Sequence, residues 1–335
     1  MEISYFLHGL ALQDELKNLM SSKQKKAKTY ISNIKRLGAY ADPITEIALS
    51  WVDFDLIENV ANEAGGVRVV HAPFVQGDFP GQITGQQDFV DITNYSIETK
   101  NKLVTLIKNL SKLKKKHEPL TLIFHPLPYK ELIEPDKIIE NMQKLFSSVC
   151  DLLIDNNIYL TIENMPVFSG VHSYYNGVFT DVDFFQKFFD VCKCKNVGMT
   201  FDFGHANTVA RYNWLSGVYD NNALRDFYFQ NTFLNKVGNR VKHVHFHYNP
   251  AHLPDYNIGL LKYIPKLKNL DFHDQVGKYT KRDWVNISKV LDNVRNNQDL
   301  TVTLEVLPRT LDSFNAYLAD VNKFSNNIVI QYEQK

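Results

Sequence analysis

The chain has 335 residues, of which 44% are hydrophobic and 13% aromatic, enough to bury one large core or two small ones. Lys and Arg together number 37, as do Asp and Glu, so the net charge is zero and gives no support for broad, sequence-independent binding to DNA. No apolar run reaches the ~18 residues of a membrane span, and the first residues lack the basic leader of a signal peptide. We therefore expect a cytoplasmic protein with no membrane partner.

The sequence contains three cysteines, Cys150, Cys192 and Cys194. They are too few, and odd in number, for a disulfide framework. The spacing of Cys192 and Cys194 matches no metal-binding or redox motif, and no second cysteine pair accompanies it. We expect reduced, structural thiols.

Eight short segments rich in β-branched and aromatic residues recur along the chain, separated by longer helical patterns. They cover residues 3–7, 44–49, 67–71, 120–125, 159–163, 197–202, 241–247 and 301–306. Strands that alternate with helices predict parallel βαβ units, and eight such units are the number that closes a barrel. The expected fold class is α/β, with residues 1–335 forming one (β/α)8 TIM-barrel domain.

Helical periodicity is clearest over residues 14–35, 96–113 and 135–153. Two lysine-rich runs, 23–28 and 112–116, lie toward the C-terminal ends of the first two helices. Because barrel helices run back to the face opposite the catalytic one, these lysines are expected to solvate that face, and not to bind nucleic acid. The long connections 164–181 and 248–282 follow strands and so belong to the catalytic face.

Ionisable residues gather at the ends of the expected strands. They are His71, His125, Glu163, Asp202, His243, His245, His247 and Glu305, with His205 just after the sixth strand and Asp271 and His273 in the long loop after the seventh. Any one of them alone would more often be a hydrogen-bonded structural residue or a helix cap. Burying so many around one barrel mouth is costly unless a cation compensates them. A mixed set of imidazoles and carboxylates suits zinc, with manganese, cobalt or iron as alternatives.

Alternation along the strands supports a common direction for these side chains. His243, His245 and His247 are two residues apart, so all three can point to the same side of the seventh strand. Thr161 and Glu163 share a face in the same way, as do Thr200 and Asp202. On the last strand Thr301, Thr303 and Glu305 also share one.

The order of these motifs resembles the xylose isomerase-like barrels, the family-2 AP endonuclease group that includes endonuclease IV and many sugar phosphate isomerases and epimerases. The resemblance rests on seven motifs: His-Ala-Pro-Phe at 71–74, His-Pro at 125–126, Ile-Glu-Asn at 162–164, Phe-Asp-Phe-Gly-His-Ala-Asn at 201–207, His-Val-His-Phe-His at 243–247, Asp-Phe-His at 271–273 and Leu-Glu-Val at 304–306. It covers nearly the whole chain.

By this resemblance, the protein would bind up to three zinc ions. The first would take His71, His125 and a bridging Glu163. The second would share Glu163 and add Asp202, His245 and Glu305. The third would take His205, Asp271 and His273. Because no ligand position is missing, a barrel that binds metal without catalysis is disfavoured.

Two functions follow from the resemblance. The first is a multinuclear hydrolase of a phosphodiester, such as abasic-site DNA, in which Phe74 would act as a wedge between bases or, equally well, merely cover the barrel mouth. The second is a sugar or sugar-phosphate isomerase or epimerase with a single metal held by Glu163, Asp202, His245 and Glu305. The additional ligands favour the hydrolase. The neutral charge and the motif around Asp202 favour the isomerase.

The sequence departs from the family pattern at Tyr248, where an Asp is usual, and in a longer segment between His245 and Asp271. These departures concern the substrate more than the metals. The expected catalytic residues are Glu163, Glu305 and His205. The expected substrate contacts are Phe74, His247 and Trp214, and the aromatic side chains of Tyr174, Tyr175 and Tyr212 either line the pocket or pack within their loops.

Overall fold

The computed structural model describes nearly two thirds of the chain. The described ranges are 2–7, 44–48, 61–62, 65–72, 90–126, 134–167, 177–254, 273–294, 296–297, 300–306, 316–324 and 327–328, together with residues 32 and 58. Backbone alone is considered for the first two strands. The expected helix 14–35 and the lysine run 23–28 lie outside these ranges, apart from residue 32.

Eight parallel strands close into a barrel in chain order, from β1 to β8, with β8 pairing back onto β1. Their bounds are β1 Glu2–Leu7, β2 Ile44–Ala48, β3 Val69–His71, β4 Leu120–Phe124, β5 Ile158–Glu163, β6 Val197–Asp202, β7 Val241–Phe246 and β8 Thr301–Leu304. Each agrees with a predicted strand to within two residues at either end. The predicted fold class is therefore confirmed.

The two faces of the strands differ as the alternation predicted. On β4, Leu120, Leu122 and Phe124 are buried in the main hydrophobic core between the barrel and its helices. The opposite face points into the barrel, where Val69 and Ile123 form a small separate apolar cluster. Much of the remaining barrel interior is lined by buried polar side chains. The ionisable residues lie at the carboxyl ends of the strands.

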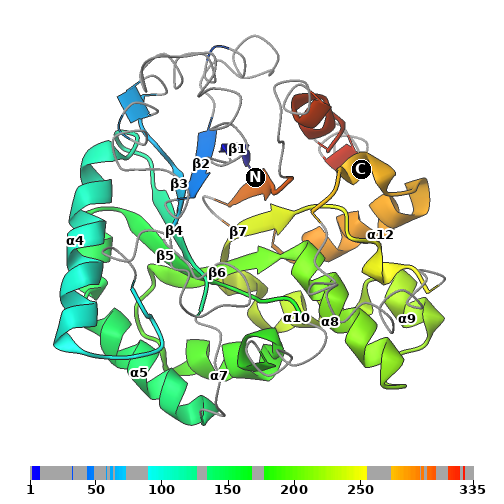
Figure 1. Cartoon of the computed structure of the whole chain (residues 1–335), viewed down its shortest axis with the longest axis horizontal. Helices are drawn as coiled ribbons and strands as arrows, with labels where there is room; N and C mark the ends of the chain where they lie inside the picture. The colour runs from blue at the N-terminus through cyan, green and yellow to red at the C-terminus, as the bar shows by residue number, and fades with distance from the viewer. Residues whose placement is uncertain are drawn as a thin grey trace, which may run out of the picture.

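The helices lie outside the strands (Figure 1). They are α4 Ile97–Leu113, α5 Pro135–Ser147, α6 Cys150–Asp155, α7 Val182–Val191, α8 Phe203–Leu215, α9 Asn221–Arg225, α10 Tyr228–Val237 and α12 Lys281–Leu291, with short 3-10 turns η1 Gly177–Thr180, η2 Gly238–Arg240, η3 Pro250–His252 and η4 Val276–Lys278. Ser96 caps α4 by accepting a hydrogen bond from the Thr99 amide, and Lys112 lies in its last turn. The predicted helix 96–113 and the placement of the second lysine run are thus as expected.

Two predictions about this part of the chain were wrong. The continuous helix expected over 135–153 is interrupted at Ser148 and Val149, between α5 and α6. The cysteines are not all reduced, because Cys150 and Cys194 form a disulfide, with Cα atoms 5.7 Å apart, and only Cys192 remains a buried thiol. The break between the helices places Cys150 at the start of α6, against the residues that lead into β6.

Among the described residues, no helix combines the length and apolar character needed to cross a bilayer.

Candidate metal centre

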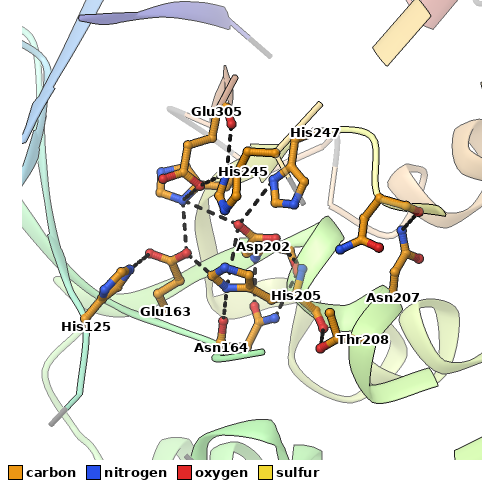
Figure 2. A network of polar contacts seen from close by, with 12 residues as sticks. His125, Glu163, Asn164, Asp202, His205, Asn207, Thr208, His245, His247 and Glu305 are labelled. Atoms are coloured by element: carbon orange, nitrogen blue, oxygen red, sulfur yellow. Dashed lines mark hydrogen bonds and ion pairs between the residues drawn. The ribbon is translucent and has the colours of Figure 1, made fainter. Parts of the chain in front are cut away.

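Four side chains converge where β5, β6, β7 and β8 end. Glu163, Asp202, His245 and Glu305 each offer one ligand atom, and these atoms all lie within 4.8 Å of one another. The His245 Nδ1 atom is 3.1 Å from Glu163 Oε1, 3.3 Å from Glu305 Oε2 and 3.8 Å from Asp202 Oδ2. All four residues are buried (Figure 2). We call this set the inner centre, and its members are those predicted for the second metal.

The barrel register explains this convergence. Asp202 lies opposite His245 across the β6–β7 ladder, and His245 lies opposite Thr303, two residues before Glu305. The shared faces predicted from alternation are present beneath the centre. There the hydroxyls of Thr161 and Thr200 are 2.7 Å apart, and His243 Nδ1 is 2.6 Å from the Thr301 hydroxyl.

A second set adjoins the inner centre through Glu163. The Nε2 atoms of His71 and His125 lie 3.2 Å apart, and they are 3.4 and 3.0 Å from Glu163 Oε2. His71 Nδ1 is 3.2 Å from the Ala72 carbonyl. Because a carbonyl only accepts, Nδ1 carries the proton, and the neutral ring therefore presents an electron pair at Nε2. The structure thus brings together the residues predicted for the first metal.

The third predicted set is described only in part. Among the described residues, His273 is grouped with His247 and Glu305, and its ring centroid lies 6.0 Å from that of His205. His205 instead uses its Nδ1 to donate a hydrogen bond of 2.8 Å to the Asn164 carbonyl, which holds its ring beside Glu163, 3.4 Å from Oε1. Asp271 lies outside the described residues.

Asp202 is held by contacts that sequence reasoning did not identify. The Asn164 side chain accepts from the Asp202 amide at 2.7 Å and donates to the Asp202 carbonyl at 2.9 Å, which joins the ends of β5 and β6. Asp202 Oδ1 caps α8 by accepting from the His205 amide at 2.6 Å. Oδ2 is thereby turned toward the centre. In the sequence, the only sign of this role was the position of Asn164 directly after Glu163, at the end of a predicted strand.

Gly204 was also missed, although it lies within a quoted motif. A Cβ atom at this position would approach His247 Nε2 to 1.8 Å. Only glycine therefore leaves room for the His247 ring to pack against the first turn of α8.

Burial and charge act in opposite directions on the two glutamates. Burial alone would raise the pKa of Glu163, but the neighbouring His245 and His125 outweigh it and hold that pKa well below its ordinary value. At Glu305, burial prevails over the attraction of His245 and His273, and the charges of Glu163 and Asp202 add to it, so the pKa rises to about 7. For His125, burial lowers the pKa to about 4 although Glu163 opposes the shift, which keeps the ring neutral.

These residues fit a divalent cation. Glu163 Oε2, Asp202 Oδ2 and Glu305 Oε2 are buried, and Asp202 Oδ2 and Glu305 Oε2 accept no hydrogen bond from any described residue, while Glu163 Oε2 meets the imidazole nitrogens of His71 and His125. Buried carboxylate oxygens that face one another without donors are costly, and a cation is the partner that would compensate all three. Imidazole nitrogens in the same sets suit zinc, manganese, cobalt or iron better than magnesium or calcium.

The remaining predicted contacts are partly described. Phe74, Tyr174 and Tyr175 lie outside the described residues. Trp214 lies near the C-terminal end of α8, nine residues beyond His205 and thus about 13 Å along the helix. There its ring lies 4.8 Å from the Arg211 guanidinium, and its Nε1 donates to Asn221. Tyr212, on the same part of α8, is exposed. The structure therefore does not bring Trp214 to the metal ligands.

Residues 53–309 match the model of the xylose isomerase-like TIM barrel family, and the chain belongs to that family. An uncharacterized protein of Methanocaldococcus jannaschii is 26% identical over 193 residues, which cover 56% of this chain. The matched region spans 54% of that relative, about half its length.

Three solved structures illustrate the similarity in fold. A D-tagatose 3-epimerase-like protein superposes with a TM-score of 0.59 at 19% identity, covering 99% of both chains. The 3-keto-D-glucoside 4-epimerase of E. coli gives 0.58 at 12% identity, covering 96% of this chain and 98% of its own. The D-psicose 3-epimerase of Clostridium cellulolyticum H10, solved with D-tagatose, gives 0.55 at 14% identity, covering 97% and 99%.

Proposed function

We propose that this protein is a divalent-metal-dependent sugar epimerase or isomerase that transfers a proton at a carbon atom beside a carbonyl. The observation that carries the proposal is the inner centre, in which two buried glutamates from separate strands flank one His and one Asp. The named activities of the structural neighbours, which act on ketoses such as D-tagatose and D-psicose, support this choice over hydrolysis.

The two glutamates approach from different sides of the barrel. Glu163 ends β5, Glu305 follows β8, and His245 lies between them (Figure 2). Two carboxylates in this arrangement can exchange protons with the two opposite faces of one carbon atom. Epimerisation needs such a pair, because the proton leaves from one face and returns to the other.

In the proposed reaction, Glu163 takes the proton from the carbon next to the substrate carbonyl. The electron pair of the broken C–H bond moves into the carbonyl and gives an enediolate. Glu305 then delivers a proton to the opposite face, so that the product differs from the substrate only in configuration. A divalent cation, which Glu163, Asp202, His245 and Glu305 would hold, would supply Lewis-acid stabilisation of the carbonyl oxygen.

His205 and His247 are the proposed sugar contacts. Because His205 Nδ1 donates to Asn164, the neutral ring has its acceptor at Nε2, which can accept a hydrogen bond from a sugar hydroxyl. His247 Nδ1 lies 3.8 Å from Asp202 Oδ2, at the edge of the inner centre. Together they would orient the substrate over the two carboxylates.

Deuterium exchange tests the proposal directly. The manganese- or cobalt-loaded protein is incubated with D-tagatose, D-fructose or D-psicose in deuterium oxide and followed by NMR. We expect one deuteron at the carbon beside the carbonyl and the appearance of the epimer or isomer. Glu163→Gln and Glu305→Gln should abolish both signals, whereas Glu140→Gln, a change on the exposed side of α5, should not. Failure of all ketoses and ketose phosphates to exchange would rule the proposal out.

A phosphodiester hydrolase is the second candidate. The observation that favours it is the pair His71 and His125, which completes a further ligand set on Glu163 and has no role in chemistry with one metal. Incision of an abasic-site oligonucleotide by the metal-loaded protein, lost in His71→Ala, would establish it.

A further inference from the structure

Residues 247–249 form the short segment that directly follows β7, and side chains from two other parts of the chain bind its carbonyls. Tyr279 lies just before α12, and its hydroxyl donates to the His247 carbonyl at 3.1 Å. Asn207 lies on α8, and its Nδ2 atom donates to the Asn249 carbonyl at 3.4 Å. The backbone that carries the His247 ring into the site is therefore fixed from two separate elements.

A chain of buried hydrogen bonds ends at the His247 carbonyl. A carbonyl only accepts, so the single proton of the Tyr279 hydroxyl points to it, and the hydroxyl oxygen in turn accepts from Asn207 Nδ2 at 3.3 Å. The Oδ1 atom of the same amide accepts from Gln230 Nε2 at 2.5 Å. Burial raises the pKa of Tyr279, so the hydroxyl keeps its proton. All four residues are buried and the direction of each donor is determined, so the chain fixes a single arrangement.

Asn207 and its neighbour Thr208 tie α8 to the segments that follow the strands on either side of β6 (Figure 2). Thr208 Oγ1 donates to the His205 carbonyl at 2.7 Å and accepts from the Val167 amide at 2.8 Å, on the segment after β5. Asn207 reaches the segment after β7. The second turn of α8 therefore connects the ends of β5 and β7, two strands that carry ligands of the inner centre.

The position of the His247 ring depends on this backbone. Its Nε2 atom lies against Gly204, in the space that a Cβ atom would fill, and its Nδ1 atom is 3.8 Å from Asp202 Oδ2. A ring packed this closely cannot turn to compensate for movement of its own backbone. A shift of the His247 carbonyl would therefore move the ring relative to Asp202 and to a sugar bound beside it.

We propose that Tyr279, supported by Asn207, is a positioning residue that sets the place of the His247 ring at the edge of the inner centre. It acts through the backbone of His247 and not through the substrate. The inference rests on the proposed function in one respect, namely that His247 contacts the sugar. Tyr279 lies outside all the motifs that carry the family resemblance, so the motifs do not reveal this role.

Steady-state kinetics of Tyr279→Phe test the proposal on the cobalt-loaded protein with the ketose that it turns over. The change removes one hydroxyl and leaves the ring in contact with Phe227, Phe246 and Trp284. We expect KM to rise about tenfold, kcat to stay within about twofold and cobalt content to stay the same, because a displaced sugar contact weakens binding more than proton transfer. Tyr228→Phe removes the same hydroxyl from an exposed tyrosine at the start of α10 and should change neither constant.

A double-mutant cycle distinguishes positioning from a general effect on the fold. In a His247→Ala background, Tyr279→Phe should have no further effect on KM, because the ring that it positions is gone. A general structural role would raise KM by the same factor in both backgrounds. That result, or an unchanged KM in Tyr279→Phe alone, would overturn the proposal. His247→Gln, which also lacks the ring, provides a second background if His247→Ala does not fold.

NMR of the histidine rings gives a readout that does not depend on turnover. The ring signals of His247 in isotope-labelled protein are assigned by their loss in His247→Ala or His247→Gln. We expect these signals to shift in Tyr279→Phe and to stay in place in Tyr228→Phe. If they shift as expected but no ketose reacts, the proposed function fails and the positioning role stands. If a ketose reacts and the His247 signals are the same in Tyr279→Phe as in the wild type, the positioning role alone fails.

Discussion

Buried polar side chains have different kinds of neighbours at the two ends of the barrel. At the amino ends of the strands, buried polar groups lie against groups of opposite charge or against backbone carbonyls. Arg68 pairs with Glu118 at 2.8 Å, and the buried Asn196 donates to two backbone carbonyls, those of Leu153 and Ile158. At the carboxyl ends, three like-charged carboxylates, those of Glu163, Asp202 and Glu305, lie together around His245.

This difference assigns stability of the fold to the amino ends of the strands and function to their carboxyl ends. Paired polar groups at the amino ends stabilise the connections between helices and strands. Clustered carboxylates at the carboxyl ends lower the stability of the metal-free protein through their mutual repulsion, and binding of a cation would relieve that repulsion. The comparison predicts that the same chemical change will have opposite consequences at the two ends.

The largest effect is expected from removing a ligand of the inner centre. Asp202→Asn replaces a charged oxygen, leaves the shape unchanged, and should lower kcat/KM by about a thousandfold or more, equivalent to about 4 kcal/mol. Metal content should fall with it, while the fold, followed by circular dichroism, stays intact. Full activity in a variant that has lost the inner metal would show that the carboxyl ends are not the functional end.

The next largest effect belongs to the amino ends. The Cys150–Cys194 disulfide closes a sequence separation of 44 residues, so its reduction should lower the free energy of unfolding by about 3 kcal/mol without changing metal content. Urea unfolding with and without reductant measures this. Cys192→Ser should retain the response to reductant, and Cys150→Ser should lose it. A change in bound metal on reduction would contradict the separation of the two ends.

The sequence predicted the barrel and most of the centre because both depend on local patterns. Alternation along each strand determines which side chains face inward, and closure of eight parallel strands places their carboxyl ends on one rim. Glu163, Asp202, His245 and Glu305 therefore converge without further information. The inner centre required only the strand boundaries and the parity of each ligand.

Tertiary contacts account for what the sequence did not reveal. The orientation of His205 depends on a hydrogen bond to the Asn164 carbonyl, and that of His247 on packing against Gly204, and neither contact leaves a periodic signal in the sequence. The disulfide likewise depends on where a helix break places Cys150. Cysteine counting addresses a framework of several bridges and does not detect one bond between neighbouring helix ends.

A smaller effect, with a pH dependence, is expected at Glu305. Its pKa is raised from 4.5 to about 7 in the folded, metal-free protein, so the folded state holds a proton that the unfolded state releases between these values. This contribution to stability is present at low pH and is lost as the pH rises through that window. Glu305→Gln should therefore stabilise the metal-free protein by about 2 kcal/mol near pH ~8 and by almost nothing near pH ~4. Urea unfolding at both pH values provides the test, and destabilisation near pH ~8 would contradict it.

The smallest effect is the matched change at the other end, Glu118→Gln. Glu118 Oε2 is 2.8 Å from Arg68, whose side chain is 6% exposed, and Oε1 is 3.2 Å from Lys115. Neutralising Glu118 leaves the guanidinium with a weaker partner in a poorly solvated position. Because the Glu118 side chain is itself 33% exposed, water moderates the loss, and we expect about 1 kcal/mol of destabilisation with unchanged metal content. The same Glu→Gln replacement would then stabilise at the carboxyl ends and destabilise at the amino ends. If both variants shift urea unfolding in the same direction near pH ~8, the contrast between the two ends does not hold.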